Sequence, residues 1–129
     1  MSERLKYVKR ADQTVVAVQL ALDTAGFTYQ KWGGSQICKA NDWIVNGGGG
    51  VYTVDASTFA RTYRHVGAGA YLKTTPVWAA VAGIAGDVKT KEGVTHYEAG
   101  DYLVSNEEQG GDGYAVSVDT FEAMYERTA

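Results

Sequence analysis

The sequence predicts a mostly β fold of the α+β class, and its composition is the first reason. The 129 residues include 15 Val and 12 Thr but only 5 Leu, together with 9 Tyr, 16 Gly and a single Pro. Val, Thr and Tyr favour a pleated strand, whereas Leu is the commoner residue of helices. The composition therefore disfavours helical bundles, coiled coils and leucine-rich repeats, and it indicates short strands joined by many turns.

The second observation is an internal repeat, which divides the chain into two similar copies. Residues 42–46 (DWIVN) match residues 101–105 (DYLVS), and the copies span residues 6–66 and 70–127. Further matched pairs are Tyr7 with Tyr71, Lys9 with Lys73, Tyr52 with Tyr114, Phe59 with Phe121, and Tyr63 with Tyr125. A copy of about 60 residues would be marginally stable alone. We therefore expect one pseudo-twofold unit with a shared core, and two loosely packed copies are the alternative.

The first part of each copy is expected to hold a strand and a hairpin. An apolar strand comes first, at residues 14–20 in one copy and 76–81 in the other. The hairpins join residues 27–32 to 35–39, turning at Gly33-Gly34, and residues 87–91 to 94–97, turning at Glu92-Gly93. Gly at these turns supplies the positive φ that a tight hairpin needs.

The second part of each copy is expected to be a strand, a Gly-rich turn, a Tyr-x-Val strand and a short closing helix. Ser57 and Asp119 occupy matched positions and are both good N-cap residues. The aromatic pairs that follow are spaced four apart, so each pair lies on one helix face and covers its small antiparallel sheet. These pairs are Phe59 with Tyr63 and Phe121 with Tyr125.

The second copy carries residues 98–104 (EAGDYLV), a Gly-containing turn, a Tyr-x-Val strand and residues 119–126 (DTFEAMYE). This pattern resembles the small phage-borne PGDYG proteins, and the first copy resembles them from residues 7–9 to Tyr63. The sequence departs from the motif at Ala99, which stands where the motif has Pro. The resemblance implies a bacteriophage or prophage origin and no particular reaction.

Several classes of protein are disfavoured by simple counts. The chain has no run of about 18 apolar residues, so no transmembrane helix is expected. The charged N-terminus lacks the apolar core of a signal peptide, and the single cysteine, Cys38, allows no internal disulfide, so a cytoplasmic location is expected. A small buried hydrophobic role is expected for Cys38. The net charge of −3 provides no general attraction to nucleic-acid polymers or membranes.

Acid–base and metal chemistry have few candidates. Asp42 and Asp101 are matched acids that could act as acid and base or bind a metal, but turn residues that bond local backbone amides are the favoured interpretation. The two histidines, His65 and His96, have no other ligand at metal-binding spacing. We expect neither a metal site nor a cofactor.

Ligand binding has three groups of candidates. Gly48 and Gly49 belong to a four-glycine loop that could approach a phosphate, although a hairpin tip is the favoured interpretation. Arg61, Arg64 and His65 form a basic cluster that could hold a phosphorylated ligand, if it is not a solvated helix face. The aromatic residues least tied to the repeat are freer to serve a binding site than the matched ones, which are expected in the core. They are Tyr29, Trp32, Trp78 and Tyr97.

These observations lead to three hypotheses about function. The first is a non-enzymatic phage accessory protein that binds a small anionic ligand or nucleotide and sequesters a host defence signal. The second is a protein-interaction module that inhibits a host protein or assembles with itself. The third, an enzyme, would require polar residues with shifted pKa values that converge in a deep pocket.

Overall fold

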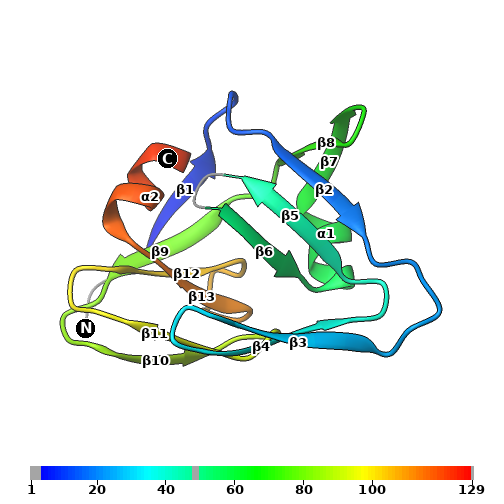
Figure 1. The fold of residues 1–129 in the computed structure, drawn as a ribbon. Coiled ribbons are helices and arrows are strands. Elements are labelled where there is room, and N and C mark those ends of the chain that lie inside the picture. The colour runs from blue at the N-terminus through cyan, green and yellow to red at the C-terminus, as the bar shows by residue number, and fades with distance from the viewer. Residues whose placement is uncertain (1–3, 48–49, 129) are drawn as a thin grey trace.

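The computed structural model describes residues 4–47 and 50–128. Within these ranges the chain forms 14 strands and two helices, so the expected mostly β character is confirmed. Two antiparallel five-stranded sheets lie side by side, and two hairpins run below them in the view of Figure 1. The expected Gly48-Gly49 loop lies outside the described residues.

The first sheet has the strand order β13-β12-β9-β1-β14. Its strands are β1 (Leu5–Lys9), β9 (Val77–Val81), β12 (Tyr102–Ser105), β13 (Gly113–Val116) and β14 (Tyr125–Arg127). The second sheet has the order β6-β5-β2-β8-β7. Its strands are β2 (Val15–Gln19), β5 (Trp43–Gly47), β6 (Gly50–Val54), β7 (Tyr63–Gly67) and β8 (Ala70–Lys73). The helices α1 (Ala56–Thr62) and α2 (Val118–Met124) precede β7 and β14.

The two halves of the chain exchange their first strands. β1, from the first half, pairs with β9 and β14 in a sheet otherwise made from the second half. β8, from the second half, pairs with β2 and β7 in the sheet of the first half. Neither five-stranded sheet is therefore complete without a strand from the other half.

Each sheet has its own aromatic core, covered by one helix. Phe59 of α1 stacks on Trp43 with ring centroids 4.1 Å apart, and Phe121 of α2 stacks on Tyr102 at the same separation. Each exchanged strand adds a tyrosine to the core it joins: the Tyr7 ring lies 4.9 Å from Phe121, and the Tyr71 ring 5.2 Å from Phe59, both edge-on. The exchange is thus reinforced by side-chain packing.

The two helices begin earlier than expected. The N-cap of α1 is Asp55, whose carboxylate accepts hydrogen bonds from the Thr58 amide and the Ser57 hydroxyl. The N-cap of α2 is Ser117, which makes no side-chain cap bond. The prediction of Ser57 and Asp119 as N-caps was therefore wrong, because the observed N-caps lie two residues before each of them. Tyr63 and Tyr125 follow the helices as extended C-cap residues, so the expectation that each Phe-Tyr pair lies on one helix face was wrong. Each tyrosine ring nevertheless stacks on its partner phenylalanine.

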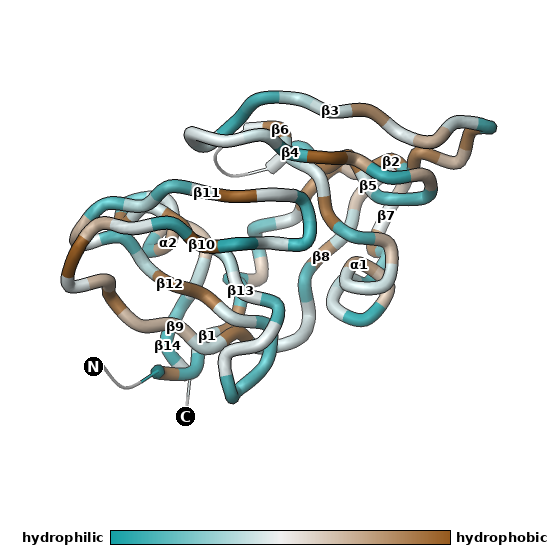
Figure 2. The backbone as a smooth tube through the Cα atoms, turned by 90° about the horizontal axis from the view of Figure 1, so that it is seen from below, coloured by the Kyte–Doolittle hydropathy of each residue, from teal (hydrophilic) through white to brown (hydrophobic). Residues whose placement is uncertain are grey.

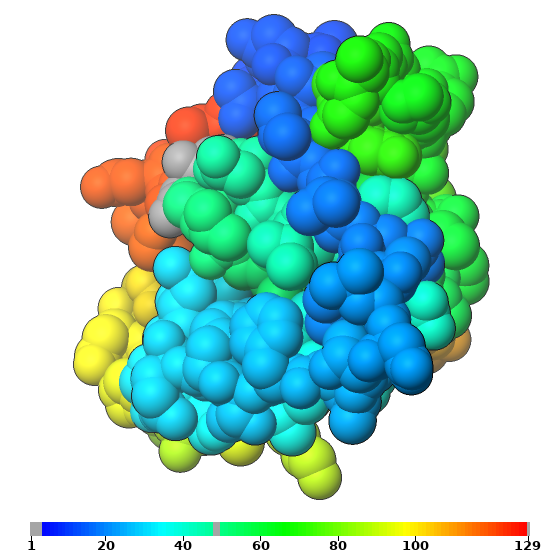
Figure 3. Space-filling model, turned by 45° about the vertical axis from the view of Figure 1, so that its right-hand side comes forward, coloured from blue at the N-terminus to red at the C-terminus, as the bar shows by residue number. Residues whose placement is uncertain are grey.

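The hairpins β3 (Gly26–Lys31) with β4 (Gly34–Lys39) and β10 (Gly86–Lys89) with β11 (Val94–Tyr97) touch each other (Figure 2). The fully buried Gln36 donates to the carbonyl of Val94 at 2.7 Å, and the His96 amide donates to the carbonyl of Trp32 at 3.0 Å. A Cβ at Gly93 would lie 1.9 Å from the Ser35 carbonyl oxygen, so this contact requires glycine. In Figure 3 the light-blue residues of the β3–β4 hairpin form one continuous surface with the teal residues of β5 and β6 above them.

Candidate functional site

A cavity of about 450 Å³ lies where the two halves meet, and we call it the central cavity. Its walls come from β6 and the first residue of β7 in the first half, from β8, β11, β13 and α2 in the second, and from the turns of both hairpins. The exposed residues Trp32 and His96 line one end, so the cavity opens to solvent there. Its volume falls within the usual range for small-molecule sites.

Four tyrosines at repeat-matched positions line the central cavity: Tyr52, Tyr63, Tyr114 and Tyr125. The hydroxyl groups of Tyr114 and Tyr125 lie 3.3 Å apart, within hydrogen-bonding distance. Burial raises the pKa of all four hydroxyls above the ordinary value of 10.0. They therefore stay neutral at physiological pH, and each can donate a hydrogen bond to a bound acceptor.

Lys73, at the end of β8, is a buried lysine in the lining of the central cavity. Its Nζ donates to Asn106 Oδ1 at 2.6 Å and to the Tyr114 hydroxyl at 3.1 Å. Neither partner is charged, and none of the ion pairs among the described residues includes Lys73. Burial, with repulsion from Lys9, lowers the pKa of Lys73 from 10.5 to about 7.

Lys9, the repeat-matched residue on β1, lies behind the tyrosine wall of the central cavity. Its side chain is buried, and its Nζ has no hydrogen-bond partner among the described residues. That Nζ lies 5.9 Å from the Tyr63 ring centroid and 5.7 Å from that of Tyr125. Burial lowers the pKa of Lys9 to about 8.

Two buried lysines without a carboxylate partner are unusual. Lysine is almost never buried unless it is paired, because burying an unpaired ammonium is costly. The backbone exchange places both residues at the junction, where no acidic side chain bonds either Nζ among the described residues. An anion in the central cavity would supply the missing counter-charge.

A network of ion pairs closes the junction at one side of the central cavity. Lys91, from the β10–β11 turn, lies 3.7 Å from Asp55 and 3.8 Å from Asp112, and Arg61 lies 3.5 Å from Asp112. The same side holds Glu92, whose pKa burial raises to about 7. The network joins α1 of the first half to the β12–β13 loop and the β10–β11 turn of the second.

The matched acids Asp42 and Asp101 occupy local turns, as the favoured interpretation of the sequence held. The Asp42 carboxylate is buried and accepts from the Lys39 amide, the Lys39 ammonium and the Ala56 amide at 2.8–3.0 Å. Asp101 accepts from the Glu98 amide at 2.9 Å. Each carboxylate thus stabilises its own turn, and the two do not form a shared acid–base pair.

The expected ligand-binding residues are dispersed over the described structure. Trp32 lines the central cavity, and the Tyr29 hydroxyl bonds to Thr53, which also lines it. Arg61 faces Asp112 in the ion-pair network. The others do not line the central cavity: Arg64 and His65 are exposed on β7, Trp78 is half-buried on β9, and Tyr97 is half-buried on β11. Cys38 is fully buried and free, as expected.

Sequence reasoning did not single out the lysines and tyrosines of the central cavity as a binding site. The available signal was the repeat itself, since Lys9 with Lys73 and two pairs of tyrosines are matched. The sequence predicts the matched aromatic residues in the core, whereas the structure places two matched pairs of tyrosines around a cavity, next to the strands β1 and β8 that carry the two lysines. Within the described residues, no helix is long and apolar enough to cross a membrane.

A comparison of the chain with protein-family models, curated proteins and solved structures found no match in any of the three. Function is therefore inferred from the chemistry of the central cavity, whose lining combines a buried lysine, neutral tyrosine hydroxyls and an exposed tryptophan with the carboxyl groups of Glu92, Asp101 and Asp112.

Proposed function

We propose that the protein binds a small anionic ligand in the central cavity. The unpartnered, buried ammonium of Lys9 beside the carboxylate-free Lys73 is the observation that carries the proposal. Lys73 contacts the anion directly, and Lys9 adds positive potential through the tyrosine wall. The hydroxyls of Tyr114 and Tyr125 donate hydrogen bonds to it.

A nucleotide is the form of anion that the mouth of the cavity supports best. Trp32 lies there in the left-handed region, at φ 55°, with its ring centroid 6.1 Å from that of Tyr52. An exposed aromatic ring at the mouth of a cavity that holds a buried lysine is a platform on which a base stacks while its phosphate lies at Lys73. Sequestering a nucleotide signal would suit the phage setting that the sequence resemblance implies.

We also propose that the site arose by duplication of one unit, and that the two copies are related by a pseudo-twofold axis. Three facts support it: the two halves have the same order of elements, they exchange equivalent strands, and matched residues meet at the central cavity. In this interpretation, Lys9 and Lys73 are the same residue of one ancestral unit.

Isothermal titration calorimetry with inorganic phosphate, AMP and cyclic dinucleotides tests the proposal. Lys73→Met removes the ammonium that contacts the anion and is expected to abolish binding, whereas Lys89→Met, on an exposed strand, is the matched control. Affinity is expected to fall as pH rises through about 7 and 8, because the free lysines then lose their protons. A ligand at about 100 times its Kd stabilises the fold by about 2.7 kcal/mol. No binding by any of these anions, or equal binding by Lys73→Met, would contradict the proposal.

A second candidate function, a protein-interaction module, is favoured by one surface feature. Val16 and Val18 of β2 are 62% and 61% exposed on the outer face of the second sheet. Sedimentation equilibrium tests self-association: Val16→Thr would lower the association constant if a second copy covers this face. A monomer at all concentrations would exclude that form of the hypothesis.

A further inference from the structure

We propose that Lys73 is a nucleophilic amine that forms a reversible imine with an aldehyde or ketone group of the bound anion. This inference rests on the proposed function and specifies its ligand class: a small carbonyl compound that carries a carboxylate or phosphate group.

The geometry around Lys73 is that of a reactive amine. Its Nζ lies in the lining of a cavity that opens to solvent, with the neutral groups of Asn106 and Tyr114 at 2.6 and 3.1 Å. Asp112, an acid of the cavity lining, accepts instead from Asn106 Nδ2 at 3.1 Å and from the Thr58 hydroxyl, and it pairs with Arg61 and Lys91. Lysines become nucleophiles when they are desolvated near another cation, and Lys9 repels a proton on Lys73 in this way.

The surrounding groups keep part of the Lys73 population neutral. Burial and Lys9 lower its pKa to about 7, and Asp112 opposes this shift. Near pH 7 about half of the molecules would then hold a free amine, against roughly one in 3,000 for a lysine of ordinary pKa. Burial raises the pKa of Tyr114 and of Tyr125, so both hydroxyls stay protonated. Neither becomes a phenolate, whose negative charge would favour the protonated form of Lys73.

Lys73 and Tyr114 supply and take up every proton that imine formation requires. The Nζ lone pair forms a bond to the carbonyl carbon, and the oxygen accepts a proton from the Tyr114 hydroxyl, which regains one from Nζ. In the second step the nitrogen lone pair forms the C=N bond, and the hydroxyl leaves as water with a proton from Tyr114, which takes up the remaining Nζ proton in the same step. Tyr114 therefore stays neutral, water is the sole by-product and no oxidant is needed.

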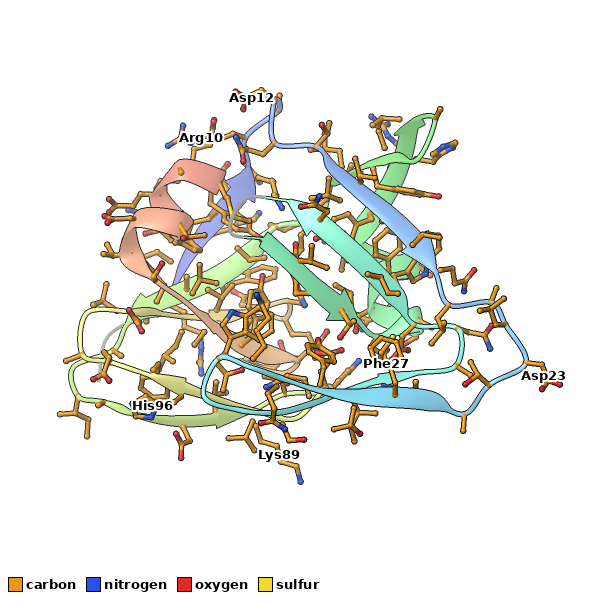
Figure 4. All side chains as sticks on the ribbon, in the orientation of Figure 1. Arg10, Asp12, Asp23, Phe27, Lys89 and His96 are labelled. Atoms are coloured by element: carbon orange, nitrogen blue, oxygen red, sulfur yellow. The ribbon has the colours of Figure 1, made fainter. Side chains whose placement is uncertain are left out.

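Reductive trapping of the full chain tests the inference. Pyruvate with cyanoborohydride, which delivers hydride to an imine carbon, is followed by peptide mass mapping near neutral pH. The reference lysine is the exposed Lys89, which points away from the molecule (Figure 4). Lys73 is expected to be labelled at least about tenfold faster than Lys89, with a rate that saturates with pyruvate. Labelling of Lys73 no faster than that of Lys89 would overturn the inference.

Two further measurements separate the roles of the neighbours. Lys9→Met removes the adjacent positive charge, so the half-maximal rate of Lys73 labelling is expected at a higher pH; an unchanged profile would refute the positioning role of Lys9. Methyl pyruvate, which lacks the carboxylate, is expected to label Lys73 more slowly than pyruvate. Calorimetric binding of phosphate without labelling of Lys73 would overturn the imine alone. The absence of both phosphate binding and Lys73 labelling would overturn the anion site as well.

Discussion

The buried Lys73 of the central cavity is expected to lower the stability of the ligand-free protein. Replacing Lys73 with Met keeps most of the side-chain volume and removes the ammonium. A fall in pKa from 10.5 to about 7 corresponds to about 5 kcal/mol at about 1.4 kcal/mol per pH unit. At pH 7, where Lys73 is half protonated, the cost to folding is roughly 4 kcal/mol.

Proton binding determines whether the free energy of unfolding rises or falls with pH. The pKa of Lys73 is lower in the folded protein, so between about 7 and 10.5 the unfolded chain binds more protons, and stability rises with pH. From pH 7 to 9.5 the wild-type free energy of unfolding is expected to gain roughly 3 kcal/mol from this residue. At pH 7 Lys73→Met is expected to be more stable than wild type by about 3 kcal/mol, allowing about 1 kcal/mol for lost hydrogen bonds.

Urea unfolding at a series of pH values measures this difference. Lys89→Met, an exposed substitution on β10, controls for the loss of one positive charge and should change stability by less than about 0.5 kcal/mol at every pH. Parallel pH profiles for wild type and Lys73→Met would refute the reasoning, because they would mean that the Lys73 ammonium is not destabilised by folding.

Three further substitutions test the fold. Asp55→Ala should destabilise by about 1–2 kcal/mol at pH 7 through loss of the helix cap; the pKa of Asp55 is lowered to about 2, so the difference should shrink in acid denaturation as pH falls from about 4 towards 2. Gly93→Ala should cost more than about 2 kcal/mol in urea unfolding because its Cβ would meet the Ser35 carbonyl, whereas Gly83→Ala, with open space around it, should be nearly neutral; equal effects would contradict the hairpin contact. Phe121→Ala should lower the unfolding free energy by about 3–5 kcal/mol, and a loss below about 1 kcal/mol would exclude it from the core.

Much of the local structure could be predicted from the sequence. The β10–β11 hairpin turns where Glu92-Gly93 indicated, and the β3–β4 hairpin turns at Trp32-Gly33, one residue before the predicted Gly33-Gly34. Each Phe-Tyr pair stacks, although its tyrosine lies just beyond the helix. Two of these signals are local: the alternation of apolar residues along a strand, and glycine at a turn. They can be recognised without knowledge of the tertiary fold.

The strand exchange could not be predicted in the same way. β1 is five residues long and β8 four, and the alternation of such strands is the same whichever sheet they join. Which partner they select depends on long-range packing, such as that of Tyr7 on Phe121 and Tyr71 on Phe59. The site could not be predicted either, because the burial of Lys9 and Lys73 depends on the sheets that β1 and β8 join.

An NMR pH titration of the lysine ε-carbons, with and without saturating phosphate, tests the central claim most directly. The account predicts that Lys73 and Lys9 titrate near pH 7 and 8 in the free protein, and that both midpoints move upward when phosphate binds. Midpoints of both lysines at the ordinary value of about 10.4, or midpoints that phosphate leaves unchanged, would contradict an anion site built on these two lysines.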